Sequence, residues 1–399
     1  MCGIAGYVGG YEPSLMRSMN ALQSHRGPDG SGVWERPEHG VSLGHVRLAI
    51  LDLSDSASQP MTSPDGRFVL TFNGEIYNFK ELRHELCGRG HCFRSSGDSE
   101  VLLAGLAEWG EAFIERLNGI FSFALWDDHK RELILARDPM GIKPLYYTEP
   151  VPGTLLFASE IKALFAHPSL TPEPDFVALQ QHLAFGHTSG DQTAFRGIQR
   201  LTPGSILKWS AATSSHRVQR FWNLEIGSRE ATDYRDATVQ LRSTLDDATK
   251  RQLVSDVPTG TFLSGGLDSS LLTVIAASQT DQLDCFTTSN SSADNQLDQV
   301  AADLPHARRL AEEHGLRLHE IKMASDVADL LPKLIHHLDE PIADPAVIAC
   351  YLISKLARDK GTRVLLSGQG ADELLAGYPR YQAMQATAWL DQVPKNLRQ

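Results

Sequence analysis

The second residue of the chain combines two groups that could act as nucleophile and base. If Met1 is removed, Cys2 carries both a thiol and a free α-amine. The amine titrates at about 8 and a free thiol at about 8.5, so the amine can accept the thiol proton near neutral pH. The alternative is a small buried cysteine in an N-terminal strand, because cysteine is among the residues most often buried. Cys2 therefore predicts a catalytic site only if other residues complete it.

Polar residues later in the first half could complete such a site. Asn73 and Gly74 follow an apolar run, where a turn would offer a side-chain amide and a backbone N–H to an oxyanion. Arg47 could pair with a substrate carboxylate, and Glu75 and Asp98 could hold a substrate ammonium. Each has a structural alternative, namely a turn for Asn73 and Gly74, a surface ion pair for Arg47 and a helix N-cap for Asp98.

Two glycine-rich segments in the second half each follow a strand pattern. SGGLDSS at 264–270 opens a helix, an arrangement that cradles phosphate with backbone N–H groups and the positive helix end. It lacks the Gly-Lys-Ser/Thr of a Walker loop. The second segment is SGQGADE at 367–373. Asp268 and Asp372 are candidate Mg²⁺ ligands because Mg²⁺ bound with phosphates needs only one or two carboxylates, and helix capping is their alternative role.

The elements that must position these residues differ between the two halves. Up to about residue 205, short strand patterns at 41–43, 68–72, 121–125, 133–136 and 154–158 accompany helical patterns at 81–86 and 99–109. Runs of strands with few helices predict a sheet-rich α+β domain at 1–207. Residues 208–235 are polar and rich in Ser, Thr and Arg, which predicts a linker.

From residue 236 onward strand and helix patterns alternate. Strands are expected at 261–263, 283–288, 318–323 and 363–366, and helices at 269–277, 306–313, 327–338 and 346–358. This order predicts an α/β domain at 236–399 with a parallel sheet covered by helices on both faces.

Composition narrows the class of protein and its partners. The 399 residues are 42% hydrophobic and 22% charged, which is typical of a globular protein of about two domains. The net charge of −12, without a basic block, argues against nucleic acid or an anionic membrane as partner. Five cysteines without a CxxC pair, no long apolar stretch and no signal-peptide pattern predict a cytoplasmic protein. The oligomeric state is left open, with a homodimer as one candidate.

Six motifs of the first half occur together in a known family. They are MCGI at the N-terminus, HRGPDG (25–30), FNGEIYN (72–78), SGDSE (96–100), RDPMGIKPLYY (137–147) and FASEIKAL (157–164). In order and spacing they resemble the class II glutamine amidotransferase domain, an αββα sandwich of the N-terminal-nucleophile type. The resemblance implies hydrolysis of glutamine to glutamate and ammonia through a thioester on Cys2. It also implies glutamine contacts at Arg47, Ile50, Leu51, Asn73, Gly74, Glu75 and Asp98, with Asn73 and Gly74 forming the oxyanion hole.

The second half extends this resemblance. SGGLDSS resembles the pyrophosphate-binding loop of N-type ATP pyrophosphatases, and with SGQGADELLAGY (367–378) the chain is similar to the glutamine-hydrolysing asparagine synthetases from Met1 to about Tyr381. This implies that ATP, with Mg²⁺, adenylates a carboxylate acceptor, aspartate or an analogue. Ammonia, passed through an internal channel, then attacks the acyl-adenylate. Contacts to ATP or pyrophosphate are implied for Leu263, Ser264, Gly265, Gly266, Asp268, Ser269, Thr288, Ser367 and Gly368, and a metal role for Asp268 and Asp372.

Two departures from the family pattern bear on the acceptor. Position 369 is Gln, where these synthetases typically carry an acidic residue, and we expect this side chain to be buried beside the reacting groups. Loss of that carboxylate puts aspartate as the acceptor in question. Members of the family also usually continue well beyond the position of Gln399, so the synthetase domain is expected to be incomplete at the C-terminus. The stretch 339–345, DEPIADP, matches a family segment near the second site, where we expect at most a substrate contact.

Three functions remain open at this point. The leading prediction is a two-site amidotransferase, either an asparagine synthetase or a relative that amidates a different carboxylate, such as a cell-envelope or secondary-metabolite precursor. An intramolecular cyclase of the β-lactam synthetase type has no need of the Cys2 thiol. A relative that only binds nucleotide has no need of Cys2, Asn73, Asp268 and Asp372 together.

Overall fold

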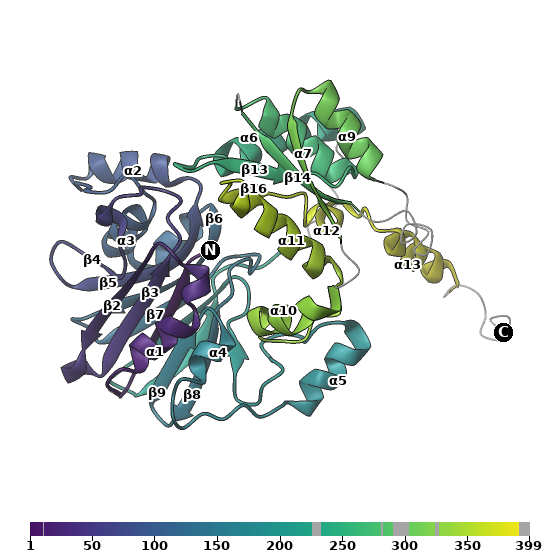
Figure 1. The fold of residues 1–399 in the computed structure, drawn as a ribbon. Coiled ribbons are helices and arrows are strands. Elements are labelled where there is room, and N and C mark those ends of the chain that lie inside the picture. The colour runs from purple at the N-terminus through teal and green to yellow at the C-terminus, as the bar shows by residue number, and fades with distance from the viewer. Residues whose placement is uncertain (11, 226–232, 281, 290–302, 324–326, 391–399) are drawn as a thin grey trace. The chain divides into compact units, whose positions relative to one another are not determined.

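The chain forms two compact units, which Figure 1 shows in a computed structural model. The structure describes all residues except 11, 226–232, 281, 290–302, 324–326 and 391–399. The first unit comprises Met1–Ala231 together with Ala328–Pro345, and the second comprises Thr232–Val327 and Ala346–Gln399. A short segment from the second half of the sequence therefore belongs to the first unit.

The first unit contains two six-stranded antiparallel sheets. One has the order β10-β8-β9-β1-β3-β2 and the other β12-β11-β7-β6-β5-β4. Their strands are β1 (Gly3–Val8), β2 (Gly30–Arg36), β3 (Val41–Arg47), β4 (Met61–Thr62), β5 (Phe68–Ile76), β6 (Gly119–Asp127), β7 (Glu132–Arg137), β8 (Tyr146–Val151), β9 (Thr154–Ala158), β10 (Gln199–Arg200), β11 (Ser205–Ser210) and β12 (Ser215–Arg220).

Apolar side chains from both sheets form one buried core between them. It joins Ile4 and Leu43 of the first sheet to Val69, Trp126 and Leu135 of the second. These central strands are apolar on both faces, because helices cover the outer face of each sheet. The face-to-face packing of two sheets places Cys2, at the start of β1, near the end of the sandwich.

Helices cover the outer faces of the two sheets. Helix α1 (Leu15–Leu22) and the short α4 (Ile161–Leu164) pack on β1 and β9, and α3 (Ser99–Trp109) packs on β5 beside α2 (Phe79–Gly88). The unit also contains α5 (Phe176–Phe185) and α10 (Leu331–Leu338). The expected αββα sandwich is confirmed, and the pattern at 99–109 matches α3 at both ends.

Part of the expected linker is a β-hairpin. Strand β11 pairs with β7, and β12 pairs with β11, so residues 205–220 extend the second sheet. Strand β12 is an edge strand whose side chains are almost all exposed. Its residues are therefore mostly polar, and a search for apolar patterns does not predict a strand there. The end of the expected linker, at 226–232, lies outside the described residues.

The second unit is built on a four-stranded parallel sheet with the order β15-β14-β13-β16. The strands are β13 (Thr259–Phe262), β14 (Asp284–Ser289), β15 (Arg317–Lys322) and β16 (Val364–Leu366), each near an expected position. Its helices are α6 (Tyr234–Gln252), α7 (Leu267–Ala277), α9 (Leu304–Glu313), α11 (Ala346–Asp359), α12 (Ala371–Leu375) and α13 (Pro379–Leu390).

The order of these strands defines a switch point in the sheet. From β13 the chain moves outward through β14 and β15, and then returns to place β16 on the other side of β13. One apolar cluster packs α7 and α9 on one side of the sheet, and another packs α11 against Phe286. Ligands of such sheets bind at the carboxyl ends of the strands beside the switch point, here between β13 and β16. Within the described residues, no helix has the length and apolar character required to cross a membrane.

Candidate active site

The Cys2 thiol is held at the edge of a small cavity in the first unit. Its Sγ accepts a hydrogen bond from the Leu48 N–H at 3.4 Å and donates one to the Leu48 carbonyl at 3.6 Å. The backbone carbonyl of Cys2 accepts a 2.9 Å hydrogen bond from Arg26 Nε. These contacts from two other elements fix both the backbone and the side chain of the predicted nucleophile.

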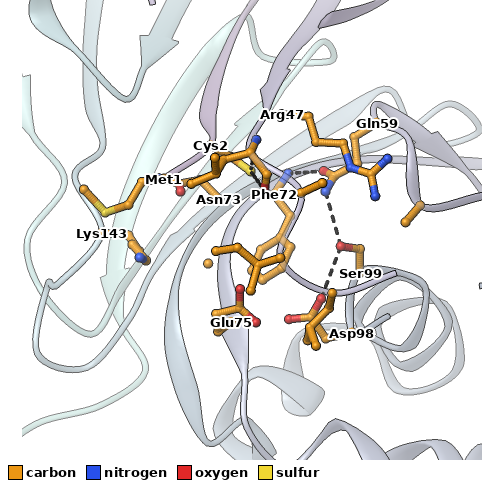
Figure 2. A pocket seen from close by; sticks show the side chains of 16 residues that line it. Met1, Cys2, Arg47, Gln59, Phe72, Asn73, Glu75, Asp98, Ser99 and Lys143 are labelled. Carbon is orange, nitrogen blue, oxygen red and sulfur yellow. Dashed lines mark hydrogen bonds between the residues drawn. The ribbon is translucent and has the colours of Figure 1, made fainter. Parts of the chain in front are cut away.

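The cavity, of about 70 Å³, is lined by every residue predicted to contact glutamine. Figure 2 shows how the labelled side chains converge on it. The lining consists of Met1, Cys2, Arg47, Leu48, Ala49, Ile50, Leu51, Ala57, Gln59, Phe72, Asn73, Gly74, Glu75, Asp98, Ser99 and Lys143. The predicted residues come from separate stretches of the chain, and folding brings them together around the thiol.

Asn73 offers the cavity an unused hydrogen-bond donor. Its Nδ2 is buried and has no hydrogen-bond partner in the described part of the chain. A buried unpaired donor costs free energy, about 1–3 kcal/mol, and so points to a group that binds there. The turn expected at this position does not form, because Asn73 and Gly74 lie inside β5 and pair with Ser122 and Phe121 of β6. The amide is thus presented by a rigid strand.

Two acidic side chains in the cavity wall oppose one another's ionisation. Burial raises the pKa of Asp98 to about 6. Burial and the neighbouring Asp98 raise the pKa of Glu75 well above its usual value. The alternative role of Asp98 as a helix cap is not seen, since its side chain accepts a 2.9 Å hydrogen bond from the Ile76 N–H of β5 and makes no capping bond to α3. A cationic ligand group would relieve the repulsion between the two carboxylates.

Arg47 lies on the cavity wall with part of its guanidinium already committed. Nη1 donates to the Ser54 carbonyl at 2.9 Å, and Nη2 donates to the Asp52 carbonyl. Neutral carbonyl partners fix the guanidinium while leaving its positive charge uncompensated. Among the residues that the structure describes, it does not form the surface ion pair considered as its alternative role, and it can attract a carboxylate.

Three further polar residues of the lining were not predicted from the sequence. Gln59 donates to Ser99 at 3.2 Å and accepts a 2.6 Å hydrogen bond from the Phe72 N–H. Ser99 in turn donates to Asp98 at 3.4 Å. Lys143 lies in the RDPMGIKPLYY motif, which was recognised as a family signature but given no chemical role. Motif matching could have identified Lys143, whereas nothing in the local sequence marks Gln59.

A network of buried charges connects Arg26 to the segment 328–345. Arg26 Nη1 and His25 Nε2 lie 3.0 and 2.9 Å from Glu160 Oε1, and Lys162 Nζ lies 2.6 Å from Glu160 Oε2. Lys162 also pairs with Asp339 Oδ1 at 2.8 Å. Burial alone would raise the pKa of Glu160, but the His25 hydrogen bond and the charges of Arg26 and Lys162 hold it at about 2.

The neighbouring Glu340 is occupied in the same unit. Its carboxylate accepts hydrogen bonds of 2.8 Å from the Ala194 N–H and from Arg200 Nη2. Asp339 accepts a 2.7 Å bond from the Ile161 N–H as well. These two carboxylates have partners within the first unit, and the expectation of substrate contact for 339–345 stays a prediction.

The predicted phosphate loop occupies the carboxyl end of β13 in the second unit. Ser264 Oγ lies 2.9 Å from Ser269 Oγ and accepts a 3.2 Å hydrogen bond from the Gly266 N–H. Gly265 has φ +99°, a conformation that favours glycine. The loop leads directly into α7, whose first-turn N–H groups are suited to an anion. Thr288 lies near the end of the adjacent strand β14.

The second glycine-rich segment lies against this loop. A Cβ on Gly368 would come within 2.9 Å of both Asp268 Cβ and the Ser269 nitrogen, so the two loops touch at the switch point. Burial, and then the nearby Asp372, raise the pKa of Asp268. The side chain of Gln369 is exposed, which corrects the expectation that it is buried. Gln369 follows the end of β16, and its backbone N–H donates to Ser367 Oγ at 3.3 Å.

No set of three or more His, Cys, Asp or Glu side chains is arranged to hold a metal ion in the part of the chain that the structure describes. The pair Asp268 and Asp372 is compatible with Mg²⁺, which takes only one or two carboxylates when it binds with phosphates. The repulsion between these two carboxylates is what a divalent cation would relieve.

Comparison with known protein families agrees with this geometry. Residues 1–222 match the family described as "Glutamine amidotransferase domain". The chain belongs to the glutamine amidotransferase family. Residues 240–399 of this amidotransferase match the family described as "Asparagine synthase". The resemblance predicted from the motifs is thereby confirmed.

The amidotransferase is also similar to curated proteins. It is 36% identical over 99% of its length to a "Putative asparagine synthetase [glutamine-hydrolyzing]" of Mycobacterium tuberculosis (strain ATCC 25618 / H37Rv), and 38% identical over 95% of its length to "Asparagine synthetase [glutamine-hydrolyzing] 3" of Bacillus subtilis (strain 168). The match spans 62% and 63% of those proteins. It is 33% identical over 91% of its length to "Amidase chyE" of Penicillium rubens, of which the match spans 54%.

Proposed function

We propose that the first unit hydrolyses glutamine and that the residues from 236 onward use the ammonia to amidate a carboxylate at the expense of ATP. The observation that carries the first half is the cavity at Cys2. It presents a held thiol, an unpartnered Asn73 amide donor, a guanidinium and two carboxylates to one small space. The thiol and the Asn73 amide match the side-chain amide of glutamine, the guanidinium matches its α-carboxylate, and the two carboxylates match its α-ammonium.

The glutaminase step follows from these positions. After removal of Met1, the α-amine of Cys2 takes the thiol proton, and Sγ forms a bond to the amide carbon of glutamine. The carbonyl oxygen becomes an oxyanion that Asn73 Nδ2 and the Gly74 N–H stabilise. Collapse of this intermediate breaks the C–N bond, and the leaving group takes the amine proton and departs as ammonia. Water then hydrolyses the thioester to glutamate and restores the thiol.

The α-amine suits this role because its surroundings disfavour charge. In the chain with Met1 in place, burial lowers the pKa of the terminal amine to about 5, with further contributions from the neighbouring positive groups Arg26 and Lys143. The α-amine of Cys2, freed next to this position, must be neutral near pH 7 to accept the thiol proton. Glu75 and Asp98 lie ready for the glutamine ammonium, and Arg47 for its carboxylate.

The synthetase step is supported by the two loops at the switch point. An acceptor carboxylate oxygen attacks the α-phosphorus of ATP and pyrophosphate leaves; ammonia then attacks the acyl carbon, AMP leaves and one proton is released. The Ser264–Ser269 loop would hold the phosphates, with Leu263, Thr288, Ser367 and Gly368 around the nucleotide. Mg²⁺ held by Asp268 and Asp372 would neutralise phosphate charge.

The direct test measures both products in the full-length protein. Glutamate and pyrophosphate are quantified with glutamine, ATP, Mg²⁺ and aspartate or other carboxylates. The proposal predicts stoichiometric AMP, pyrophosphate and amide with at least one acceptor. If glutamate is released but no acceptor leads to pyrophosphate release, the proposed synthetase reaction is refuted and the proposed glutaminase reaction is retained.

A second candidate is an amidotransferase whose acceptor is not aspartate. It is favoured by Gln369, which cannot pair as a charge with an ammonium or accept a proton as a carboxylate does. A carboxylate larger than aspartate, such as a cell-envelope or secondary-metabolite precursor, fits a neutral side chain better. The test compares aspartate-dependent pyrophosphate release by the wild type and by Gln369→Glu. Efficient asparagine formation by the wild type would exclude this candidate, and a gain of it in the variant would support it.

A further inference from the structure

A lysine lines the Cys2 cavity without an ion-pair partner. Lys143 is 7% exposed, and Figure 2 shows it on the cavity wall beside Met1. Within the described residues it forms no ion pair; Glu75 is the negative group that acts on it most strongly. Lysine is rarely buried unless it is paired, so a buried ammonium that faces a cavity needs an explanation.

The loop that carries Lys143 is fixed by two buried charged side chains. The Asp138 carboxylate accepts four backbone N–H bonds, from Phe121 at 3.2 Å, Met140 at 3.1 Å, Ile142 at 3.0 Å and Lys143 at 2.9 Å. Each of these bonds holds the chain between β7 and β8 in one conformation. Asp138 is 1% exposed, so this is an interior scaffold.

Arg137 completes the scaffold from the other side. Its guanidinium donates to the carbonyls of Lys143 at 2.8 Å, Leu201 at 2.7 Å and Gly141 at 2.7 Å. Lys143 therefore has both its N–H and its carbonyl held by buried charges. A surface lysine needs no such support, whereas a lysine that must keep its ammonium in one place does.

The charges around the thiol explain what this ammonium can do. The groups that face Cys2 are the terminal amine, Arg26, Arg47, Glu75, Asp98 and Lys143. Burial raises the pKa of the Cys2 thiol; Glu75 adds to the rise, whereas Lys143 opposes it. Lys143 also helps to lower the pKa of the terminal amine. The effect on the thiol favours the thiolate that the proposed reaction needs.

We propose that Lys143 is a positioning residue of the glutaminase reaction, whose fixed positive charge favours the Cys2 thiolate. The proposal rests on the proposed function of Cys2 and adds a residue to it. Lys143 forms no bond to substrate and acts through the charge state of Cys2. Arg47, and not Lys143, binds the α-carboxylate of glutamine in the proposed reaction.

The test follows the reactivity of the Cys2 thiol without requiring turnover. The rate of Cys2 alkylation by iodoacetamide is measured against pH on protein shown by intact mass to lack Met1. Peptide mapping is needed because Cys87, Cys92 and Cys350 are also exposed. We expect Lys143→Met to move the midpoint of the alkylation profile to higher pH by about one unit, and Lys143→Arg to restore it.

Two further variants make the result decisive. Lys143→Gln also removes the positive charge but keeps a polar side chain, and it should likewise move the midpoint to higher pH, which tests the same effect if Lys143→Met fails to fold. Lys130→Met, which removes an exposed lysine of the same unit, should leave the midpoint unchanged. A folded Lys143→Met or Lys143→Gln protein with the wild-type profile would overturn the proposal.

The glutaminase assay separates this inference from the function on which it rests. If the proposed function is right, Lys143→Met lowers kcat/KM for glutamine most at low pH and recovers as pH rises, while Lys143→Arg keeps the wild-type profile. If wild-type protein alkylates as expected but hydrolyses no glutamine, the proposed function fails while the charge effect on Cys2 stands.

Discussion

Arg26 connects the residue that carries the thiol to a buried acid. Its Nε donates to the Cys2 carbonyl at 2.9 Å, while Nη1 donates to Glu160 at 3.0 Å. The guanidinium therefore fixes the backbone from which the nucleophile projects. The same Glu160 binds Lys162, which pairs with Asp339 of the segment 328–345. The position of Cys2 thus depends on residues that are far apart in the sequence.

We predict that Arg26→Met lowers kcat/KM for glutamine by about 10–100-fold, because a displacement of the nucleophile by about 1 Å is enough for such a loss. Loss of the guanidinium also leaves the buried Glu160 with fewer partners. Arg17→Met, an exposed arginine on α1, is the matched control and should keep full activity. The measurement is steady-state glutamate release. Equal kinetics in the two variants would show that Arg26 is not needed to position Cys2.

Glutamine binding should weaken on the acidic side of pH 6. The pKa of Asp98 is about 6, because burial disfavours its charge. Below that pH the carboxyl is protonated and no longer attracts the glutamine ammonium, so a proton must be released on binding. We expect KM to rise about tenfold per pH unit below 6 for one such group. In Asp98→Asn, KM should be high throughout and lose this dependence; a wild-type KM that stays flat from pH 7 to 5 would contradict the role of Asp98.

Gly368→Ala should disable the nucleotide site alone. The added Cβ would meet Asp268 Cβ and the Ser269 nitrogen, each at 2.9 Å, so the phosphate loop must shift. Glutamine hydrolysis, which we propose for the other unit, serves as the internal control. Acceptor-dependent pyrophosphate release is the measurement, and we expect a loss of at least about tenfold, equivalent to about 1.4 kcal/mol. Unchanged release would show that the contact between the two loops has no functional role.

Asp268→Asn and Asp372→Asn should each reduce Mg²⁺-dependent pyrophosphate formation and spare glutamine hydrolysis. Asp372 contributes to the raised pKa of Asp268, which shows that their charges act on each other. If the two residues served only as helix caps, substitution would cost about 1 kcal/mol of stability or less and leave adenylation intact. Titration of pyrophosphate release with Mg²⁺ separates the two roles, since loss of a ligand raises the Mg²⁺ concentration required for half-maximal rate.

The sequence predicted site residues best where they lie in motifs that follow one another in a fixed order. Asn73 and Glu75 lie in one motif and Asp98 in another, and these motif contexts marked them for one site, whereas Arg47 lies outside the six motifs and was proposed from its side-chain chemistry and the family resemblance. The parallel direction of strands β13 to β16 was likewise predicted from the alternation of strand and helix patterns. The relation between Gly368 and Asp268 could then be expected, because adjacent parallel strands end at the same edge of a sheet.

Features that depend on tertiary packing could not be predicted in this way. Strand β12 is polar because it lies at a sheet edge, so its apolar signal is too weak to detect. The chain continues as strand through Asn73 and Gly74 because β6 pairs with it, although Asn-Gly favours turns. The carboxylates of Asp339 and Glu340 accept hydrogen bonds from the N–H groups of Ile161 and Ala194, which lie 178 and 146 residues earlier in the same unit, and local pattern cannot indicate such contacts.

Replacement of Cys2 tests most directly whether this residue performs the glutaminase reaction. Glutamate release from glutamine is measured for the wild type, with loss of Met1 verified by intact mass, and for Cys2→Ala. We predict that the variant loses glutaminase activity completely while ammonium salts still support acceptor-dependent pyrophosphate release, because free ammonia bypasses the first site. Glutamine hydrolysis that persists in Cys2→Ala would contradict the assignment.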